Sequence, residues 1–351
     1  MLYQTKNPHG GDIYDGVVEL DFSANTNPYG TPQGIIDAVT ASLAEMHRYP
    51  DPYCRELVRG ISEFEGVPKE YILCGNGAAD LIYAYCGAVR PKRAAQLAPT
   101  FSEYGLGLRR SGCTEVFPYV LKEENGFQPD RGILTFLEET GAEVLFLCNP
   151  NNPTGKILDP ALLDEILRFT KERGIRLFVD ECFLDLTENG RSLKEFLGDN
   201  PQLFLLKAFT KSYGMAGIRL GYCMTSDSAL LTGMSRISQP WNVSSLAQAA
   251  GVAALKEGEF LRKTKALIHD QRNWLKAELQ ALGLKVTDSE TNYLLFRGPE
   301  NLHGALREKH IAIRNCDNYA GLGKGWYRIA VRLPEENERL IGAMREILGR
   351  V

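Results

Sequence analysis

Three short apolar runs, spaced about 30 residues apart, constrain the fold of this 351-residue chain more than any other feature. They are Val144–Cys148, Ile175–Asp180 and Leu203–Lys207, and a fourth run, Tyr71–Cys74, precedes them. This is the spacing of a strand–helix–strand unit, and residues 162–174 between two of the runs have helical periodicity and end at a glycine. Short, fully apolar strands are typical of a parallel sheet covered by helices. We therefore expect an α/β fold.

The pattern changes after about residue 245, which indicates a second domain. A long helical stretch, Ser245–Leu282, is followed by shorter strand-like segments and by a final helix from Glu335. The loop-like N-terminal segment would have nothing to pack against unless it joined this second unit. We predict a large domain of residues 41–245, and a discontinuous, smaller α+β domain of residues 1–40 and 246–351 that closes over the substrate.

The composition excludes several kinds of partner. Forty Lys and Arg against 44 Asp and Glu give a net charge of -4, which lacks the basic surplus that nucleic acids require. No apolar run approaches the ~20 residues that cross a bilayer, and the start has no signal sequence, so we expect a cytoplasmic protein. The eight cysteines form no C-x-x-C pair, which predicts reduced, buried thiols and no bound metal. Any cationic site must therefore be local.

Polar residues follow each apolar run, where ligands of an open parallel sheet bind. Gly75–Asp80 is a glycine turn that opens a helix, whose first N–H groups can hold a phosphate. Asn149–Gly155 leaves amide side chains at the sheet edge, and Asp180 ends the next run. Each has a simpler interpretation: a structural turn, an Asn that satisfies its own backbone, and a carboxylate in a salt bridge.

Lys211 lies between Thr210 and Ser212, directly after the last run, and Arg219 follows eight residues later. This setting is unusual for a solvated lysine. Desolvation and neighbouring cations would lower its pKa, as suits an amine that forms a Schiff base with a carbonyl cofactor. The planar fork of an arginine suits a phosphate dianion.

The order of these parts, a phosphate turn, an Asn, an Asp, a Lys and an Arg, resembles the fold-type I pyridoxal-phosphate (PLP) enzymes, the aspartate aminotransferase superfamily. The resemblance spans almost the whole chain. It implies a large domain with a mainly parallel sheet, a smaller α+β domain, and PLP as cofactor. By resemblance, Lys211 carries the Schiff base, Asp180 pairs with the pyridine nitrogen and Asn152 contacts the ring oxygen. The resemblance assigns the cofactor phosphate to Gly77, Ala78, Ala79, Thr210 and Arg219.

Two tyrosines and two departures complete the cofactor site that the resemblance implies. Tyr104 would stack on the ring, and Tyr49 would reach the phosphate of the neighbouring subunit in a homodimer. Many relatives have Tyr where this chain has Phe183, and a hydroxyl where it has Ala208. The ring oxygen and the phosphate would each lose one usual contact.

Within the superfamily, NPNNPTGK and TKSYGMAGIRLGY resemble the branch of histidinol-phosphate aminotransferases and threonine-phosphate decarboxylases. The start HGGDIY, the segment IRNCDNYAGLGKGWYRIAVR and Phe183 are similar to the decarboxylases. That resemblance implies decarboxylation of O-phospho-L-threonine or O-phospho-L-serine, to (R)-1-aminopropan-2-yl phosphate or ethanolamine phosphate, for the nucleotide loop of cobalamin. By resemblance, the phosphorylated amino acid is held by His9, Gly10, Asn25, Asn152, Arg314 and Arg328.

Two other functions remain open. Histidinol-phosphate transamination with 2-oxoglutarate would use every cofactor residue named above, since the choice of reaction depends on which Cα bond is perpendicular to the cofactor ring. A PLP-sensing regulator on the same fold is disfavoured, because such regulators carry a DNA-binding domain and this chain starts almost directly at the His9 motif.

Overall fold

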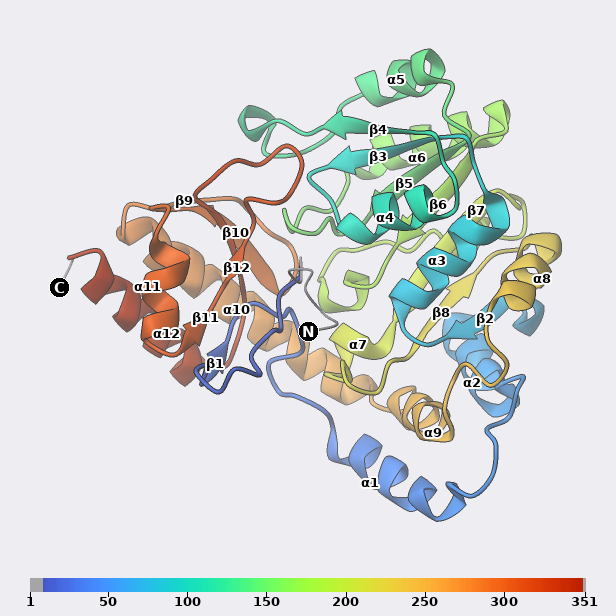
Figure 1. The fold of residues 1–351 in the computed structure, drawn as a ribbon, viewed down its shortest axis with the longest axis horizontal. Helices are drawn as coiled ribbons and strands as arrows, with labels where there is room; N and C mark the ends of the chain where they lie inside the picture. The colour runs from blue at the N-terminus through green and yellow to red at the C-terminus, as the bar shows by residue number, and fades with distance from the viewer. Residues whose placement is uncertain (1–8, 350–351) are drawn as a thin grey trace.

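The computed structural model describes residues 9–349 and is built around a seven-stranded sheet (Figure 1). The strand order is β2-β8-β7-β6-β5-β3-β4. Every neighbouring pair from β7 to β4 is parallel, whereas β8 runs antiparallel to both β2 and β7. The predicted α/β fold is therefore confirmed. The strands are β2 (Ile72–Gly75), β3 (Arg93–Ala98), β4 (Glu115–Val120), β5 (Val144–Cys148), β6 (Arg176–Asp180), β7 (Leu203–Ala208) and β8 (Gly221–Met224).

Helices cover both faces of this sheet. One face packs against α3 (Ala78–Val89), α4 (Ser102–Arg110) and α8 (Ser228–Ile237), and the other against α5 (Gly132–Thr140) and α6 (Pro160–Arg173). The ends of α6 follow from its sequence: the Asp159 side chain accepts from the Leu162 N–H, Pro160 starts the helix, and Gly174 ends it at a φ of 71°. Further helices are α1 (Gln33–Ser42), α2 (Arg55–Glu65) and α9 (Ser245–Ala254), with α1 packed on α9.

An aromatic stack holds the central strands together. Phe146 of β5, Phe178 of β6 and Phe204 of β7 lie side by side, with ring centroids 4.5 and 4.8 Å apart, and Tyr85 of α3 packs against all three. All four side chains are fully buried. Because these strands are parallel neighbours, their carboxyl ends come together at one edge of the sheet.

A second, antiparallel sheet lies beside the first (Figure 1). Its order is β12-β13-β10-β9, and α10 (Gly258–Ala281), α11 (Leu302–Glu308) and α12 (Pro334–Ile347) share its apolar core. Strand β1 (Leu20–Asp21) pairs in parallel with β11 (Ile311–Ala312), so the N-terminal segment joins this unit. The remaining strands are β9 (Lys285–Val286), β10 (Tyr293–Arg297), β12 (Arg314–Asn315) and β13 (Trp326–Ala330).

The proposed domain boundaries at residues 41 and 245 stay a prediction, and residues 1–8 and 350–351 of the predicted small domain lie outside the described residues. All eight cysteines are unpaired thiols; seven are buried and Cys74 is half-buried. Within residues 9–349, no helix is long and apolar enough to cross a membrane. In the same range, no three His, Cys, Asp or Glu side chains are grouped so that they could hold a metal ion.

Candidate active site

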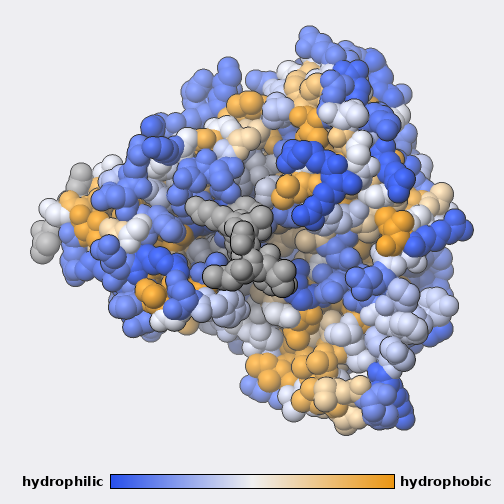
Figure 2. Space-filling model, viewed as in Figure 1, coloured by the Kyte–Doolittle hydropathy of each residue, from blue (hydrophilic) through white to orange (hydrophobic). Residues whose placement is uncertain are grey.

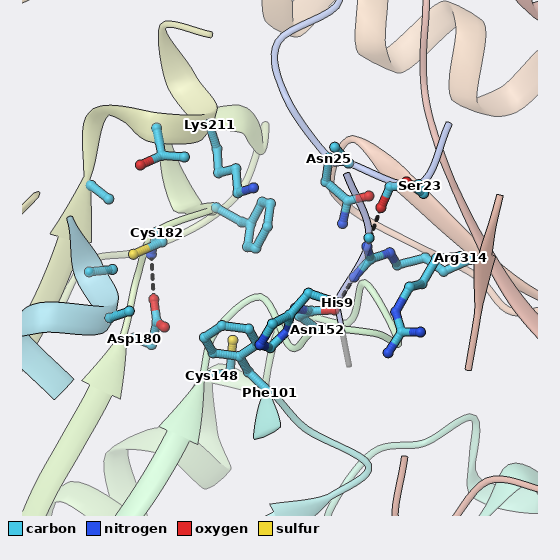
Figure 3. Close-up of a pocket in the computed structure, with 18 of the residues that line it drawn as sticks. His9, Ser23, Asn25, Phe101, Cys148, Asn152, Asp180, Cys182, Lys211 and Arg314 are labelled. Atoms are coloured by element: carbon cyan, nitrogen blue, oxygen red, sulfur yellow. Dashed lines mark hydrogen bonds between the residues drawn. The ribbon is translucent and has the colours of Figure 1, made fainter. Parts of the chain in front are cut away.

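A cleft opens where the carboxyl ends of β3, β5, β6 and β7 face the second sheet (Figure 3). Lys211 and Asp180 lie on one side of it, and Asn25 and Arg314 lie on the other. The structure brings into its lining most of the residues that the sequence singled out, namely His9, Gly10, Asn25, Ala78, Ala79, Tyr104, Asn152, Asp180, Thr210, Lys211, Arg219, Arg314 and Arg328.

Lys211 supplies the reactive amine of the cleft. It sits on the short helix α7 (Phe209–Ser212), which begins directly after β7. Burial, followed by the charge of Arg328, lowers its pKa to about 8, so roughly a tenth of the amine is unprotonated at pH 7, far more than for an ordinary lysine. Its Nζ lies 5.8 Å from the centre of the Phe183 ring. An unprotonated, buried amine is what capture of a carbonyl cofactor requires.

Asp180 supplies a buried carboxylate at the end of β6. Its Oδ2 accepts a hydrogen bond from the Tyr104 hydroxyl at 2.7 Å, and its Oδ1 accepts from the Cys182 N–H at 2.9 Å. Burial raises the pKa of Asp180, and the two hydrogen bonds oppose that shift. A carboxylate so placed is stabilised by a cation, and the protonated pyridine nitrogen of PLP is a cation of suitable size.

Three elements form a cradle for a phosphate. Gly77 precedes α3 at a φ of 85°, and a Cβ at this position would lie 2.5 Å from Nη2 of Arg219. The guanidinium therefore occupies the space that a side chain at residue 77 would fill. Ala78 and Ala79 open α3, so their N–H groups are among those without a partner inside the helix. With Thr210 on the same cleft, the donor set fits the phosphate of PLP.

Two aromatic rings line this cleft. Tyr104, the predicted stacking residue, is fully buried among protein atoms, packs on Phe146 at 5.5 Å and donates its hydroxyl to Asp180. Phe101, which the sequence pattern did not single out, is half-buried and lines the cleft next to His9. Stacking of Tyr104 on the cofactor ring stays a prediction. Phe101 follows β3, an alanine-rich strand with Arg and Gln that the apolar-run criterion did not detect.

The two residues that depart from the family pattern, Phe183 and Ala208, have different surroundings. Phe183 packs edge-on against Tyr293 at 5.0 Å and joins a small apolar cluster with Leu186 and Ile268. A ring with a hydroxyl is therefore replaced here by one that packs within an apolar cluster. Ala208 lines the cleft without a group that can donate to a phosphate.

Arg328 and Asn152 bind each other at the inner end of the cleft. Nη1 of Arg328 donates to Oδ1 of Asn152 at 2.5 Å, and Nη2 donates to the carbonyl of Ser23 at 2.8 Å. The Nε of Arg328 and both amide atoms of Asn25 are buried and have no hydrogen-bond partner. Buried polar groups of this kind are expensive unless a ligand satisfies them, so this end fits a polar or anionic substrate group.

Arg314 and His9 lie at the outer end of the cleft. Nη2 of Arg314 donates to Asn318 at 2.7 Å, and its guanidinium carbon lies 5.3 Å from the centre of the Tyr319 ring. Both residues are partly exposed and also line an adjoining polar hollow. The cleft therefore has two separate cationic positions, one deep and one near the solvent.

Tyr49 is the predicted site residue that the structure places away from this cleft. Its side chain is 78% exposed, and its ring stacks on Trp241 at 4.4 Å. Contact with the phosphate of a neighbouring subunit stays a prediction.

A half-buried amine, a buried carboxylate and a phosphate cradle, arranged along one edge of this sheet, define a fold-type I PLP-dependent enzyme. The chain belongs to the aminotransferase class I and II family, whose model matches residues 18–344. It is 36% identical to the threonine-phosphate decarboxylase of Salmonella typhimurium, covering 97% of this chain and 96% of that protein. It is 37% identical to a histidinol-phosphate aminotransferase of Desulfitobacterium hafniense, covering 94% and 92%. Among solved structures, the histidinol-phosphate aminotransferase of Clostridium acetobutylicum matches with a TM-score of 0.88 at 25% identity, covering 95% and 100%.

The phosphate cradle can be tested with Gly77→Ala. The added Cβ collides with Arg219, and an alanine at a φ of 85° is strained, so we expect PLP affinity to fall about tenfold or more. An equilibrium titration of the cofactor-free protein with PLP, followed by absorbance, measures this. Gly198→Ala is the matched control, because a Cβ there meets nothing within 4 Å. Unchanged affinity in Gly77→Ala would contradict the assignment.

The lowered pKa of Lys211 predicts how capture of PLP depends on pH. Only the unprotonated amine reacts, so the capture rate should rise with pH and level off above about 8, rather than rising toward the 10.5 of an ordinary lysine. Stopped-flow absorbance on the cofactor-free protein measures the rate. In Arg328→Met the levelling should move to higher pH, because a charge that lowers the pKa is removed. A wild-type rate that still increases at pH 10 would rule out this environment for Lys211.

Proposed function

We propose that this enzyme decarboxylates O-phospho-L-threonine, or O-phospho-L-serine, to (R)-1-aminopropan-2-yl phosphate or ethanolamine phosphate. By its resemblance to the decarboxylases, the product would serve the nucleotide loop of cobalamin. The observation that carries the proposal is that Arg328 and the Arg314–His9 pair provide two cationic positions at different depths of one cleft. A phosphorylated amino acid has two anionic groups to match them, a carboxylate and a phosphate. Histidinol phosphate has only the phosphate, whereas 2-oxoglutarate, the amino acceptor of the alternative transaminase, also brings two anionic groups.

Arg328 is the group best placed to hold the carboxylate. Asn152 and the carbonyl of Ser23 fix its guanidinium, its Nε has no protein partner, and its charge acts on Lys211. A side chain that is held before the substrate arrives can decide which bond at Cα is aligned for cleavage. When bound, PLP accepts the electron pair of that bond. Lys211 can then return a proton to Cα, since its pKa of about 8 allows both protonation states at neutral pH.

A second candidate function is histidinol-phosphate:2-oxoglutarate transamination. It is favoured by relatives of that name that are as similar to this chain as the decarboxylases are. It needs the same cofactor residues and uses Lys211 to move a proton. The two candidates differ in the bond that breaks, so the products separate them.

Product identification is the test. PLP-loaded enzyme is incubated with O-phospho-L-threonine, O-phospho-L-serine or histidinol phosphate, each with and without 2-oxoglutarate, and products are identified by mass. We expect carbon dioxide and an aminoalkyl phosphate from a phospho-amino acid without 2-oxoglutarate, and loss of turnover by about a thousandfold or more in Lys211→Ala. Consumption of histidinol phosphate only with 2-oxoglutarate would favour the transaminase. Full turnover by Lys211→Ala would overturn both functions.

We also propose that the enzyme is a homodimer through the face around α1. Exposed apolar side chains gather there, at the lower edge of Figure 2. Patches of this kind are rare on monomers and mark protein contacts. A second copy on this face would bring its Tyr49 toward a neighbouring cofactor phosphate. The exposed apolar residues are Ile36, Leu43, Met46, Tyr49, Tyr53 and Trp241.

Met46→Glu tests the dimer. Its side chain is 67% exposed, so a charge there should not disturb the fold but would be buried unpaired in an interface. We expect sedimentation velocity to show a dimer for the wild type, and for this variant a monomer with weaker PLP binding. Val120→Glu, an exposed apolar residue on β4, is the matched control and should stay dimeric. A monomeric wild type at micromolar concentration would refute the proposal.

A further inference from the structure

Glu103 lies on helix α4, which packs on the seven-stranded sheet, and its carboxylate contacts His9 at the outer end of the cleft. It lies in the first turn of α4, and its exposed fraction is only 9%. Its Oε1 is 2.8 Å from Nε2 of His9, and its Oε2 accepts a hydrogen bond from the Tyr83 hydroxyl at 2.6 Å. No sequence pattern singles out this residue, because its partner His9 is 94 positions away.

The carboxylate of Glu103 is ionised at neutral pH. The hydrogen bond with His9 is the largest cause that lowers the pKa of Glu103. The hydrogen bond from Tyr83 and the charge of Arg110 lower the pKa further, whereas burial raises it. An ionised carboxylate can only accept hydrogen bonds, so Nε2 of His9 must carry a proton. The contact therefore sets which ring nitrogen faces Glu103 and so fixes the orientation of the ring.

The His9 ring is held from two directions. Glu103 binds its edge, and Phe101 lies against it with ring centroids 5.6 Å apart and a 45° tilt. These two contacts fix the orientation of the ring at the outer end of the cleft. The charged groups that share the outer hollow with it are Asp12, His303, Arg307, Arg314 and Asp317.

We propose that Glu103 is a positioning residue for the substrate phosphate, acting through His9. This rests on the proposed function, in which the outer end of the cleft receives that phosphate. Glu103 holds the His9 ring at the outer end of the cleft, where Arg314 supplies a cation for the same phosphate.

The same geometry argues against a purely structural role. The side chain of His9 is 36% exposed, and a Gln in place of the buried Glu103 keeps its size and can still hydrogen-bond both Tyr83 and His9. Loss of the charge at Glu103 should therefore change recognition of phosphate without changing the fold.

Glu103→Gln tests this, since it keeps the size of the side chain and removes its charge. Binding to PLP-loaded enzyme is titrated by cofactor absorbance with O-phospho-L-threonine and with L-threonine. We expect affinity for the phosphorylated compound to fall about tenfold, affinity for L-threonine to be unchanged, and the thermal unfolding midpoint and PLP affinity to be retained. In the His9→Asn background the same change should have no further effect. In the wild type, the Nε2 nitrogen resonance of His9 should be that of a protonated nitrogen, and it should shift in Glu103→Gln.

Glu138→Gln is the matched control, because Glu138 forms an ion pair with Arg173 at 2.6 Å on the surface and does not line the cleft. Tyr83→Phe removes only the second hydrogen bond to Glu103 and is the variant to use if Glu103→Gln fails to fold. A fall of about threefold in the affinity of Tyr83→Phe for O-phospho-L-threonine, without a fall for L-threonine, supports the proposal. A Glu103→Gln enzyme that keeps the full preference for O-phospho-L-threonine overturns it. A wild type without any such preference instead overturns the proposed function.

Discussion

The site depends on keeping two opposite charges buried at the ends of neighbouring strands. Asp180 ends β6 and Lys211 follows β7, and both are placed where an aromatic stack of Phe146, Phe178 and Phe204 excludes water. Burial alone would neutralise both groups. Tyr104 and the Cys182 N–H counter this for the carboxylate, whereas Arg328 lowers the pKa of the amine further. The hydrogen bonds thus favour the charged form of Asp180 against the effect of burial, and the amine of Lys211 is prepared to react.

Much of this could be read from the sequence, because the relevant signals are local. A buried strand can be recognised in the sequence as an apolar run followed by a polar residue. Neighbouring parallel strands bring those polar residues to one edge of the sheet. Asp180, Lys211 and the glycine turn before α3 were found in this way, and the structure places Asp180, Lys211 and the opening of α3 on one cleft. The start of α3 after Gly77 and both ends of α6 likewise follow from glycine and capping signals, whereas α3 ends at Arg90 in a left-handed conformation without a glycine.

What the sequence could not show depends on contacts between distant segments. Phe101 was missed because β3 carries Arg93 and Gln96 and does not read as an apolar run. The hydrogen bond from Tyr104 to Asp180 was not expected, because an aromatic residue in a motif does not reveal what its hydroxyl contacts. Glu103 contacts His9 only because the N-terminal segment reaches helix α4 on the seven-stranded sheet. The hydrophobic periodicity of the sequence does not predict such a contact.

The reversed direction of β8 has a consequence for how the cofactor site is assembled. Gly221, the first residue of β8, pairs with Gly75, the last of β2, and with Ala208, the last of β7. The start of one strand therefore meets the ends of two others, and a side chain just before β8, that of Arg219, reaches the same edge as those just after β2 and β7. Since β2 and β7 are two strand spacings apart, about 10 Å, β8 acts as a spacer between the phosphate turn and the reactive amine. The short segment from Lys211 to Arg219 bridges this gap, so an insertion there would alter the separation of the two groups that one cofactor molecule has to span.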